Sequence, residues 1–235
     1  NFSESSMLSR ELEENGYTIV DNSEVADFYI VHSCTVTSLA EKKARQSIRH
    51  FKKINPEAKI GVLGCYVQLR GDELQQLPEV DFIADNEEKY HLHEILNKYS
   101  NNETYTAHGD GMAYHHAYSP NDRTRSFLKV QDGCDYFCTY CAVAYARGRS
   151  RSNSTEQCMN DATEIVNSGV REIVLTGVNV GDFGKGTGEN LFQLMSNLQQ
   201  IKGLTRLRLS SIEPNLLENR IIDLVSKSET IMPHF

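Results

Sequence analysis

The sequence lacks an apolar run of about 18 residues, the length that a membrane-spanning helix needs. Its first residues, Asn1 to Ser6, have neither the basic start nor the apolar stretch of a secretory signal peptide. It also lacks an excess of basic residues: the net charge is −8, which argues against a protein that binds nucleic acid over its whole surface. From these absences we expect a soluble, cytoplasmic protein with no membrane partner.

Cysteine is sparse, with six residues in a chain of 235, yet three of the six fall within eight residues. This distribution fits metal ligation in a reducing compartment better than a disulfide framework. The hydrophobic content of 39% is enough to form a core in each of two domains.

The first hundred residues alternate helical and strand patterns, with no internal repeat. Asn15-Gly16 and Asn55-Pro56 are typical helix ends. Repeated strand and helix segments predict an open parallel α/β sheet with right-handed crossovers. We expect strands over 17–20, 28–31, 59–64 and 81–84, and a helix over 37–54.

Residues 98–125 are rich in Ser, Asn, Thr, Gly and His, a composition typical of a linker. We therefore predict an N-terminal domain over 1–100, a linker over 101–122 and a second domain over 123–235. The second domain is expected to have strands over 126–130, 172–176 and 206–210, and helices over 154–168, 191–201 and 219–226.

The second domain is too short for a complete (β/α)₈ barrel, which needs about 200 to 250 residues. Pro233-His234-Phe235 comes where another strand would begin. We therefore expect a partial barrel and a chain that is a fragment of a longer protein.

Three cysteines follow the first strand of this second domain. Cys134, Cys138 and Cys141 have the spacing C-x₃-C-x₂-C. Three thiolates can hold three irons of a cubane and leave the fourth iron open to a substrate or cofactor. The alternative is a zinc ion whose fourth ligand is His115, His116 or another cysteine.

The loop resembles that of the radical-SAM superfamily, which has this spacing and an aromatic residue before the last cysteine, as Tyr140 is here. The resemblance implies a [4Fe–4S] cluster whose open iron binds S-adenosylmethionine. An electron from a donor such as flavodoxin or ferredoxin then cleaves this cofactor to methionine and a 5′-deoxyadenosyl radical.

Two further cysteines, Cys34 and Cys65, each follow a predicted buried strand. The carboxyl ends of parallel strands meet at one edge of a sheet, so both should lie at the edge where open α/β folds bind ligands. Two unligated core cysteines are the alternative, because two thiolates alone do not hold a cubane.

Further segments resemble the methylthiotransferases, which join such an N-terminal domain to a radical-SAM barrel. The resemblance implies a second [4Fe–4S] cluster held by three N-terminal cysteines, two of them Cys34 and Cys65. Asn1 resembles the Asn of a G-C-x-x-N segment, which puts the remaining cysteine before residue 1. The matching segments are 146–152, 176–179 and 208–214.

Within this family, the residues after Cys34 and Cys65 are similar to those of the branch that acts on N6-threonylcarbamoyladenosine in tRNA. The implied reaction transfers a methylthio group to C2 of this adenine, next to the anticodon. Alternatives are isopentenyladenosine in tRNA, a ribosomal protein side chain, or a non-enzymatic iron–sulfur carrier. A C-terminal RNA-binding β-barrel of the family lies outside this sequence.

Four more residues are expected at the cofactor by resemblance. Gly177 and Asn179 would lie against the methionine part of S-adenosylmethionine, and Ser211 and Glu213 would bind its ribose hydroxyls. Without the resemblance, these residues are an ordinary turn and a polar loop. Cys158 falls within a predicted helix and is expected to be a core residue.

Two basic groups are candidates for phosphate contacts, or else ordinary solvated surfaces. They are the helix face over 42–53 and Arg147, Arg149 and Arg151.

Overall fold

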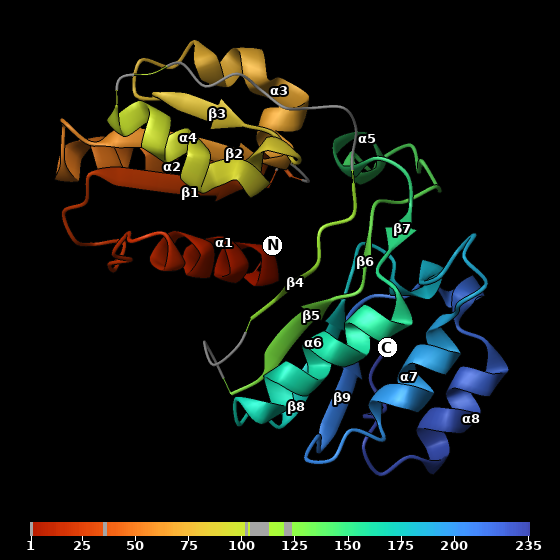
Figure 1. Ribbon diagram of the computed structural model, residues 1–235. Coiled ribbons are helices and arrows are strands. Elements are labelled where there is room, and N and C mark those ends of the chain that lie inside the picture. Colours follow the sequence, from red (N-terminus) through yellow and green to blue (C-terminus); the bar gives the residue numbers. More distant parts are fainter. Residues whose placement is uncertain (1, 35–36, 102, 104–112, 120–123) are drawn as a thin grey trace. The chain divides into compact units, whose positions relative to one another are not determined.

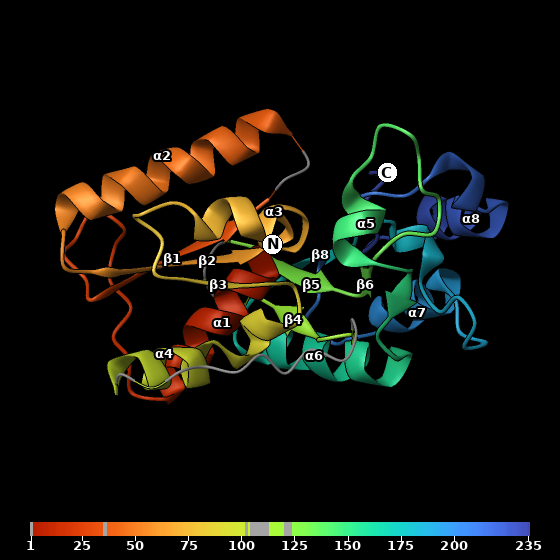
Figure 2. The same ribbon diagram turned by 90° about the horizontal axis from the view of Figure 1, so that it is seen from above.

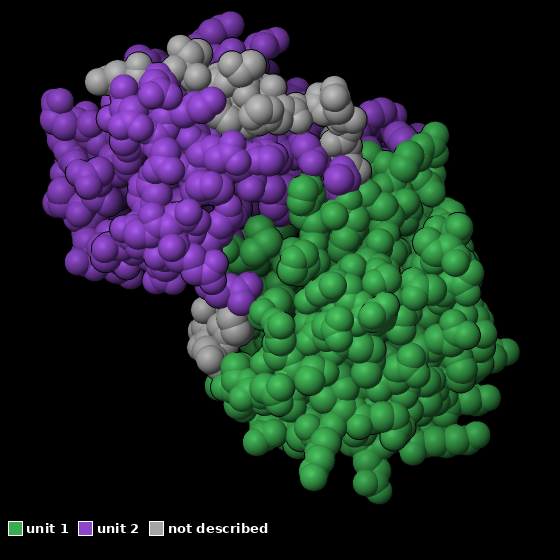
Figure 3. Space-filling view, viewed as in Figure 1, with its two compact units in different colours: residues 1–7, 114–136, 148–235 green, residues 8–113, 137–147 purple. Residues whose placement is uncertain are grey.

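The computed structural model describes residues 2–34, 37–101, 103, 113–119 and 124–235. It divides into two compact units that do not follow the order of the chain (Figure 3). The N-terminal unit comprises residues 8–113 and 137–147, and the C-terminal unit comprises residues 1–7, 114–136 and 148–235. The segment that holds the cysteine loop is therefore shared between the two units.

A three-stranded parallel sheet forms the centre of the N-terminal unit, with the order β1-β2-β3. Helices α2 and α3 lie on one face of the sheet and α4 on the other (Figure 2). The elements are β1 (Phe28–Ser33), α2 (Ser38–Ile54), β2 (Lys59–Gly64), α3 (Cys65–Gln75), β3 (Phe82–Ala84), the 3₁₀ turn η1 (Glu88–His91), and α4 (Leu92–Ser100).

Local sequence explains why these elements begin and end where they do. Thr37 caps α2 by accepting a hydrogen bond from the Ala40 N–H, and Asn55 ends the helix before Pro56. Strand β2 is buried over five of its six residues, as expected for a central strand covered on both faces. Ile48 of α2 and Val62 of β2 meet in the core of this unit.

The C-terminal unit has a four-stranded sheet in the order β4-β5-β8-β9, in which β5, β8 and β9 are parallel and β4 is antiparallel. Helices α6, α7 and α8 lie side by side (Figure 1). A small antiparallel ribbon pairs β6 with β7. The elements are β4 (Ala117–Tyr118), β5 (Ser126–Lys129), β6 (Gln131–Asp132), β7 (Arg151–Ser152), α6 (Thr155–Asn167), β8 (Glu172–Thr176), η2 (Val180–Asp182), α7 (Leu191–Leu198), β9 (Arg206–Leu209), η3 (Pro214–Leu216) and α8 (Asn219–Lys227).

Two helices involve the segments exchanged between units. Helix α1 (Phe2–Glu14) contributes its first residues to the C-terminal unit and the remainder to the N-terminal unit. Helix α5 (Val143–Arg147) follows the cysteine loop and packs against α3 within the N-terminal unit.

The predicted α/β class and most predicted elements are confirmed, but some expectations were wrong. Residues 17–20 form no strand: Ile19 and Val20 are exposed and pair with no described strand. The predicted linker contains β4, which pairs with β5. The predicted boundary near residue 122 lies outside the described residues. None of the described helices has the length and apolar character required to cross a bilayer.

Candidate active site

The cysteine loop begins at the end of β6, where Gly133 turns the chain. Gly133 has φ +72°, and a Cβ at this position would overlap the Arg149 carbonyl oxygen. The Cys134 N–H donates to the Gly148 carbonyl at 3.0 Å. The backbone before and at the first cysteine is therefore held by the strand that returns after the loop.

The other two cysteines lie in the part of the loop that belongs to the N-terminal unit. Phe137 is a non-glycine residue in the left-handed region, with φ 48°, and the Cys141 N–H donates to the Cys138 carbonyl at 2.9 Å. Phe137 packs edge-on against Tyr145 of α5, with ring centroids 5.4 Å apart. Tyr140 is 90% exposed and so contributes little to packing.

The three thiols of the loop are half-buried, and no disulfide links any of the six cysteines, all of which are described. Cys134 belongs to the C-terminal unit, and Cys138 and Cys141 belong to the N-terminal unit. Nowhere in the described ranges do three or more His, Cys, Asp or Glu side chains gather closely enough to hold a metal ion. A cluster is therefore indicated by the spacing of the three cysteines along the sequence, since their described side chains are not gathered around a common point in this structure.

The segments that follow β8 and β9 meet at the carboxyl edge of the second sheet. The Glu213 N–H donates to Asn179 Oδ1 at 3.2 Å, and the Val180 N–H donates to the Ser211 carbonyl at 3.0 Å. Ser211 Oγ lies 3.4 Å from the Gly177 carbonyl oxygen. The structure thus brings Gly177, Asn179, Ser211 and Glu213 together at this edge.

Two buried polar atoms at this edge have no hydrogen-bond partner within the described structure. They are Asn179 Nδ2 and Ser210 Oγ. Asn179 is only 3% exposed. An unsatisfied buried polar atom costs free energy, so it commonly marks a place where a ligand completes the hydrogen bonding. The edge therefore has the donor and acceptor groups for a polar cofactor.

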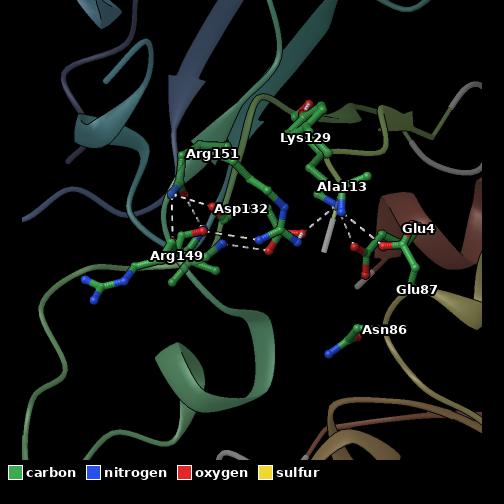
Figure 4. Close-up of polar contacts among 12 residues, drawn as sticks. Glu4, Asn86, Glu87, Ala113, Lys129, Asp132, Arg149 and Arg151 are labelled. Carbon is green, nitrogen blue, oxygen red and sulfur yellow. Dashed lines mark hydrogen bonds and ion pairs between the residues drawn. The ribbon is translucent and has the colours of Figure 1, made fainter. Parts of the chain in front are cut away.

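A buried ion network joins four elements of the C-terminal unit, α1, β5, β6 and β7 (Figure 4). Lys129 Nζ is 2.8 Å from Glu4 Oε1 and 2.9 Å from Asp132 Oδ2, and Arg151 is 3.2 Å from the same Asp132 oxygen. The hydroxyl of Tyr114 donates to the Lys129 carbonyl, and burial raises the pKa of Tyr114 well above its ordinary value. This network fixes the strand that leads into Cys134.

At the mouth of the loop, Asp135 accepts hydrogen bonds from Lys185 Nζ at 2.9 Å and from the Ser150 N–H at 3.2 Å. These contacts, that of Lys185 first, hold the pKa of Asp135 below its usual range. The residue after Cys134 is thus tied to both the returning strand and the loop that follows β8.

In the N-terminal unit, the predicted meeting of Cys34 and Cys65 at one sheet edge is confirmed by strand register. Ser33 and Gly64, the last residues of β1 and β2, are paired, and the two cysteines come next. Gly64 has φ +93°, and a Cβ there would lie 2.9 Å from the His32 ring. Cys65 is buried and Cys34 half-buried; residues 35–36 lie outside the described structure.

The side chain of Asn86, a residue that was not predicted at this site, lies against Cys65. Asn86 Nδ2 is 3.6 Å from Cys65 Sγ and donates to the Ala146 carbonyl of α5 at 2.7 Å. The contact spans 60 residues of sequence, and no local pattern around Asn86 indicates it. Cys158, as predicted, is fully buried in the core, where burial raises the pKa of its thiol.

Several basic side chains of the two predicted groups form ion pairs within the protein. Arg45 pairs with Glu73 at 3.1 Å, and Lys52 pairs with Asp81 at 3.3 Å. Arg147 is only 9% exposed, so it does not offer the surface contact that was considered. Arg149 is the most open of its group, with a side chain 76% exposed.

Comparison with known proteins gives matches along nearly the whole chain. Residues 1–85 match the family described as "Uncharacterized protein family UPF0004", and residues 128–230 match the radical SAM superfamily. In solved structures, the chain is similar to the radical S-adenosylmethionine methyltransferase TsrM from Kitasatospora setae, with a TM-score of 0.65 and 12% identity over 98% of this chain and 56% of that one. This likeness shows that the fold is a partial radical-SAM fold.

Curated relatives are nearer in sequence. The threonylcarbamoyladenosine tRNA methylthiotransferase MtaB of Thermotoga maritima is 37% identical over 98% of this chain and 54% of its own length. The protein of the same name from Rickettsia prowazekii is 38% identical over 100% of this chain and 55% of its own length. The chain thus spans about half the length of these relatives. Its two matched families and its alignment to these relatives show that it belongs to the radical-SAM methylthiotransferase family.

Proposed function

We propose that this protein transfers a methylthio group to C2 of N6-threonylcarbamoyladenosine, next to the anticodon of tRNA. Relatives that carry this activity in their names align along nearly the whole chain. The observation that carries the proposal is the carboxyl edge of β8 and β9, where Asn179 presents a buried, unsatisfied amide beside Ser211 and Glu213. The cysteine loop begins after β6, whose first residue, Gln131, accepts hydrogen bonds from the Val178 and Asn179 N–H groups at this edge.

The residues present fit a [4Fe–4S] cluster and S-adenosylmethionine. Cys134, Cys138 and Cys141 would hold three irons, and Asn179 Nδ2 would donate to the cofactor. When bound, the cluster and cofactor supply a one-electron cleavage that can abstract hydrogen from an unactivated position. Such chemistry suits C2 of adenine, because its C–H bond is not acidic enough for a general base.

The chain's own residues would orient the cofactor. Gly133 and Gly148 keep the loop backbone close to the returning strand. Ser211 and Glu213, which follow β9 at the carboxyl end of the parallel strands, would bind ribose hydroxyls. Tyr140, which is exposed, lies next to the last ligand and is available to the incoming cofactor or base. The target adenine must leave its stack to reach this edge.

The second [4Fe–4S] cluster is proposed at the edge of the first sheet. Cys34 and Cys65, which follow the paired ends of β1 and β2, would supply two of its ligands. This cluster would carry the sulfur that is transferred, while a second S-adenosylmethionine supplies the methyl group. Asn86, in contact with Cys65, would support that ligand.

The partners follow from this chemistry. tRNA is the substrate, with Arg149 the most exposed candidate for a phosphate contact in its group. A small one-electron donor such as flavodoxin or ferredoxin would reduce the cluster. The tRNA and the electron donor would both be found in the cytoplasm.

The test is anaerobic reconstitution of the full-length protein with iron and sulfide. Hypomodified tRNA, S-adenosylmethionine and dithionite are then added, and the nucleosides are analysed by mass spectrometry. A gain of one methylthio group on threonylcarbamoyladenosine supports the proposal. The same gain on isopentenyladenosine, or on a ribosomal protein, would show that the proposed substrate is wrong and identify the actual one. Production of 5′-deoxyadenosine with none of these products would support the radical cleavage of the cofactor and contradict the proposed transfer reaction.

A further inference from the structure

Gln131 joins the cysteine loop to the segment that follows β8. It is the first residue of β6, three positions before Cys134, and only 1% of its surface is exposed. Its Oε1 accepts hydrogen bonds from the N–H groups of Val178 at 2.9 Å and Asn179 at 2.8 Å. All of these residues belong to the C-terminal unit.

The amide nitrogen of the same side chain faces the cysteine loop. Nε2 donates to the Gly133 carbonyl at 2.7 Å, and it lies 3.0 Å from both the Asp132 carbonyl and Ser150 Oγ. The orientation of the amide is fixed because its oxygen meets two backbone N–H donors and its nitrogen meets two backbone carbonyls. One buried side chain thus satisfies main-chain groups of two segments. Val178 and Asn179 are 47 and 48 residues away in the sequence, whereas Asp132 and Gly133 directly follow Gln131.

Gly177 makes room for this side chain. A Cβ on Gly177 would lie 2.8 Å from Gln131 Oε1 and 3.0 Å from Gln131 Cβ. Close approach of the cofactor was the expected reason for a glycine at this position, and the packing of Gln131 is a second one. The absence of a side chain at Gly177 and the presence of an amide at Gln131 are parts of one arrangement.

Other side chains cannot make both sets of contacts. Glutamate would keep the acceptor for Val178 and Asn179 but lose the donor toward Gly133. Leucine has a similar size, yet it would leave the two N–H groups and the carbonyls buried without a partner, which costs more than the hydrogen bonds alone contribute. The position therefore demands a neutral amide of this length.

We propose that Gln131 is a positioning residue, which holds the backbone before Cys134 and the Val178–Asn179 segment in fixed register so that the two halves of the S-adenosylmethionine site meet. This inference rests on the proposed function, since it needs the cofactor at this edge. Gln131 itself does not touch the reacting atoms. It acts through Asn179, whose buried Nδ2 is thereby held at the edge of the sheet.

The experiment uses the full-length protein, reconstituted anaerobically and tested without tRNA. The variants are Gln131→Leu and Gln131→Glu, and the matched control is Gln199→Leu. Gln199, also in the C-terminal unit, is half-buried, and its Oε1 accepts a hydrogen bond from the Ser228 hydroxyl, a contact that involves neither the cysteine loop nor the segment after β8. Iron content and thermal unfolding are measured first, and S-adenosylmethionine is then titrated while the electron paramagnetic resonance signal of the reduced cluster is followed.

We expect the dissociation constant of S-adenosylmethionine to rise about tenfold in Gln131→Leu, because Asn179 would no longer be held in place and the loss of one hydrogen bond from it to the cofactor corresponds to a change of about that size. Gln131→Glu should show a smaller rise, since it keeps the acceptor, and Gln199→Leu should match the wild type. A merely structural role would lower the unfolding temperature in both Gln131 variants and leave the dissociation constant of the folded, iron-loaded fraction unchanged.

Unchanged affinity in both Gln131 variants would overturn the inference and leave the proposed function standing. If Gln131→Leu does not fold, the isosteric Gln131→Glu decides by the same measurement. A wild-type protein that holds its cluster and binds no S-adenosylmethionine would overturn the proposed function and the inference together. Because no tRNA is present, an error in the substrate assignment cannot affect the result.

Discussion

Lys129 Nζ lies 2.8 Å from Glu4 Oε1, and both side chains are almost fully buried, at 5% and 1% exposed. The two residues are 125 positions apart, yet they join the start of α1 to the end of β5 within one unit. Asp132, two residues before Cys134, shares the same ammonium group. The first cysteine of the loop is thus anchored by a buried ion pair that no local sequence pattern reveals.

Replacement of Lys129 by methionine should strongly destabilise the C-terminal unit. The change leaves the Glu4 carboxylate buried without its lysine, and breaking such a pair costs about 3 to 5 kcal/mol in the free energy of unfolding. Urea denaturation measures this cost. Lys227→Met, at the exposed end of α8, is the matched control. A loss below about 1 kcal/mol would mean that the pair is solvated rather than buried.

Replacement of Cys138 by alanine should lower the iron content after reconstitution and abolish production of 5′-deoxyadenosine, because two thiolates do not hold a cubane with one open iron. Cys158→Ala, which removes a buried core thiol away from the loop, should keep both. Iron and sulfide assays and chromatography of the reaction products measure the two effects. Equal behaviour of the two variants would contradict the ligand assignment.

Replacement of Gly133 by alanine should damage cluster binding more than a left-handed backbone alone explains. Gly133 and Gly186 have similar φ angles, +72° and +82°, but only a Cβ on Gly133 would meet the Arg149 backbone, since Gly186 has nothing within 4 Å. Gly186→Ala should cost about 1 kcal/mol of stability. Gly133→Ala should cost more and also reduce iron content. Similar iron content in the two variants would show that the loop tolerates the displacement.

The stability of the N-terminal unit should fall in acid through Asp81. Burial raises the pKa of Asp81, but hydrogen bonds from the Ile60 N–H, Lys59 and Lys52 outweigh burial and leave the pKa below its ordinary value of 3.8. Because the folded pKa is the lower one, this carboxylate stabilises the fold above pH 3.8 and the contribution is lost as pH falls through the folded pKa.

The measurement for Asp81 is the free energy of unfolding of wild type and Asp81→Asn as a function of pH. The variant should be less stable by about 1 kcal/mol or more near pH 7, and the difference should shrink as pH falls below 3.8. Asp72→Asn, at an exposed position on α3, is the control. A constant difference across this pH range would show that packing, rather than charge, accounts for the role of Asp81.

Much of the fold could be predicted because its signals are local. Strands β2 and β8 have the predicted bounds, since each is a continuous apolar run that ends at a turn. Thr37 and Ser154 cap α2 and α6 through hydrogen bonds to residues three positions ahead. Such short-range contacts can be inferred from spacing alone.

The errors come from elements whose state depends on distant partners. Residues 17–20 have a strand composition, but a strand also needs a neighbour to pair with, and composition does not supply one. Helix α3 begins at Cys65 and has a non-helical residue, Arg70, within it, so its periodicity was too weak to predict.

The candidate site was predictable to a similar degree. The cysteine spacing and the Gly177–Asn179 segment could be recognised, because both are short motifs. Gln131 and Asn86 could not, because their side chains bond main-chain groups about 50 to 60 residues away and no local pattern records those contacts. The residues that support a site are harder to predict than those that line it.

The exchange of segments between the two units also determines when each can be completed during synthesis. Helix α5 packs on α3 and its Ala146 carbonyl binds Asn86, so the N-terminal unit is not closed until the chain has been made beyond residue 147. Growth from the ribosome delivers β1 to α4 well before that point, and the nascent unit must wait for the segment that carries Cys138 and Cys141. A pause in translation after α4 is complete and before α5 has been made would therefore leave the α5-binding surface of α3 uncovered, and chaperone binding at that stage would be expected to cease once α5 emerges.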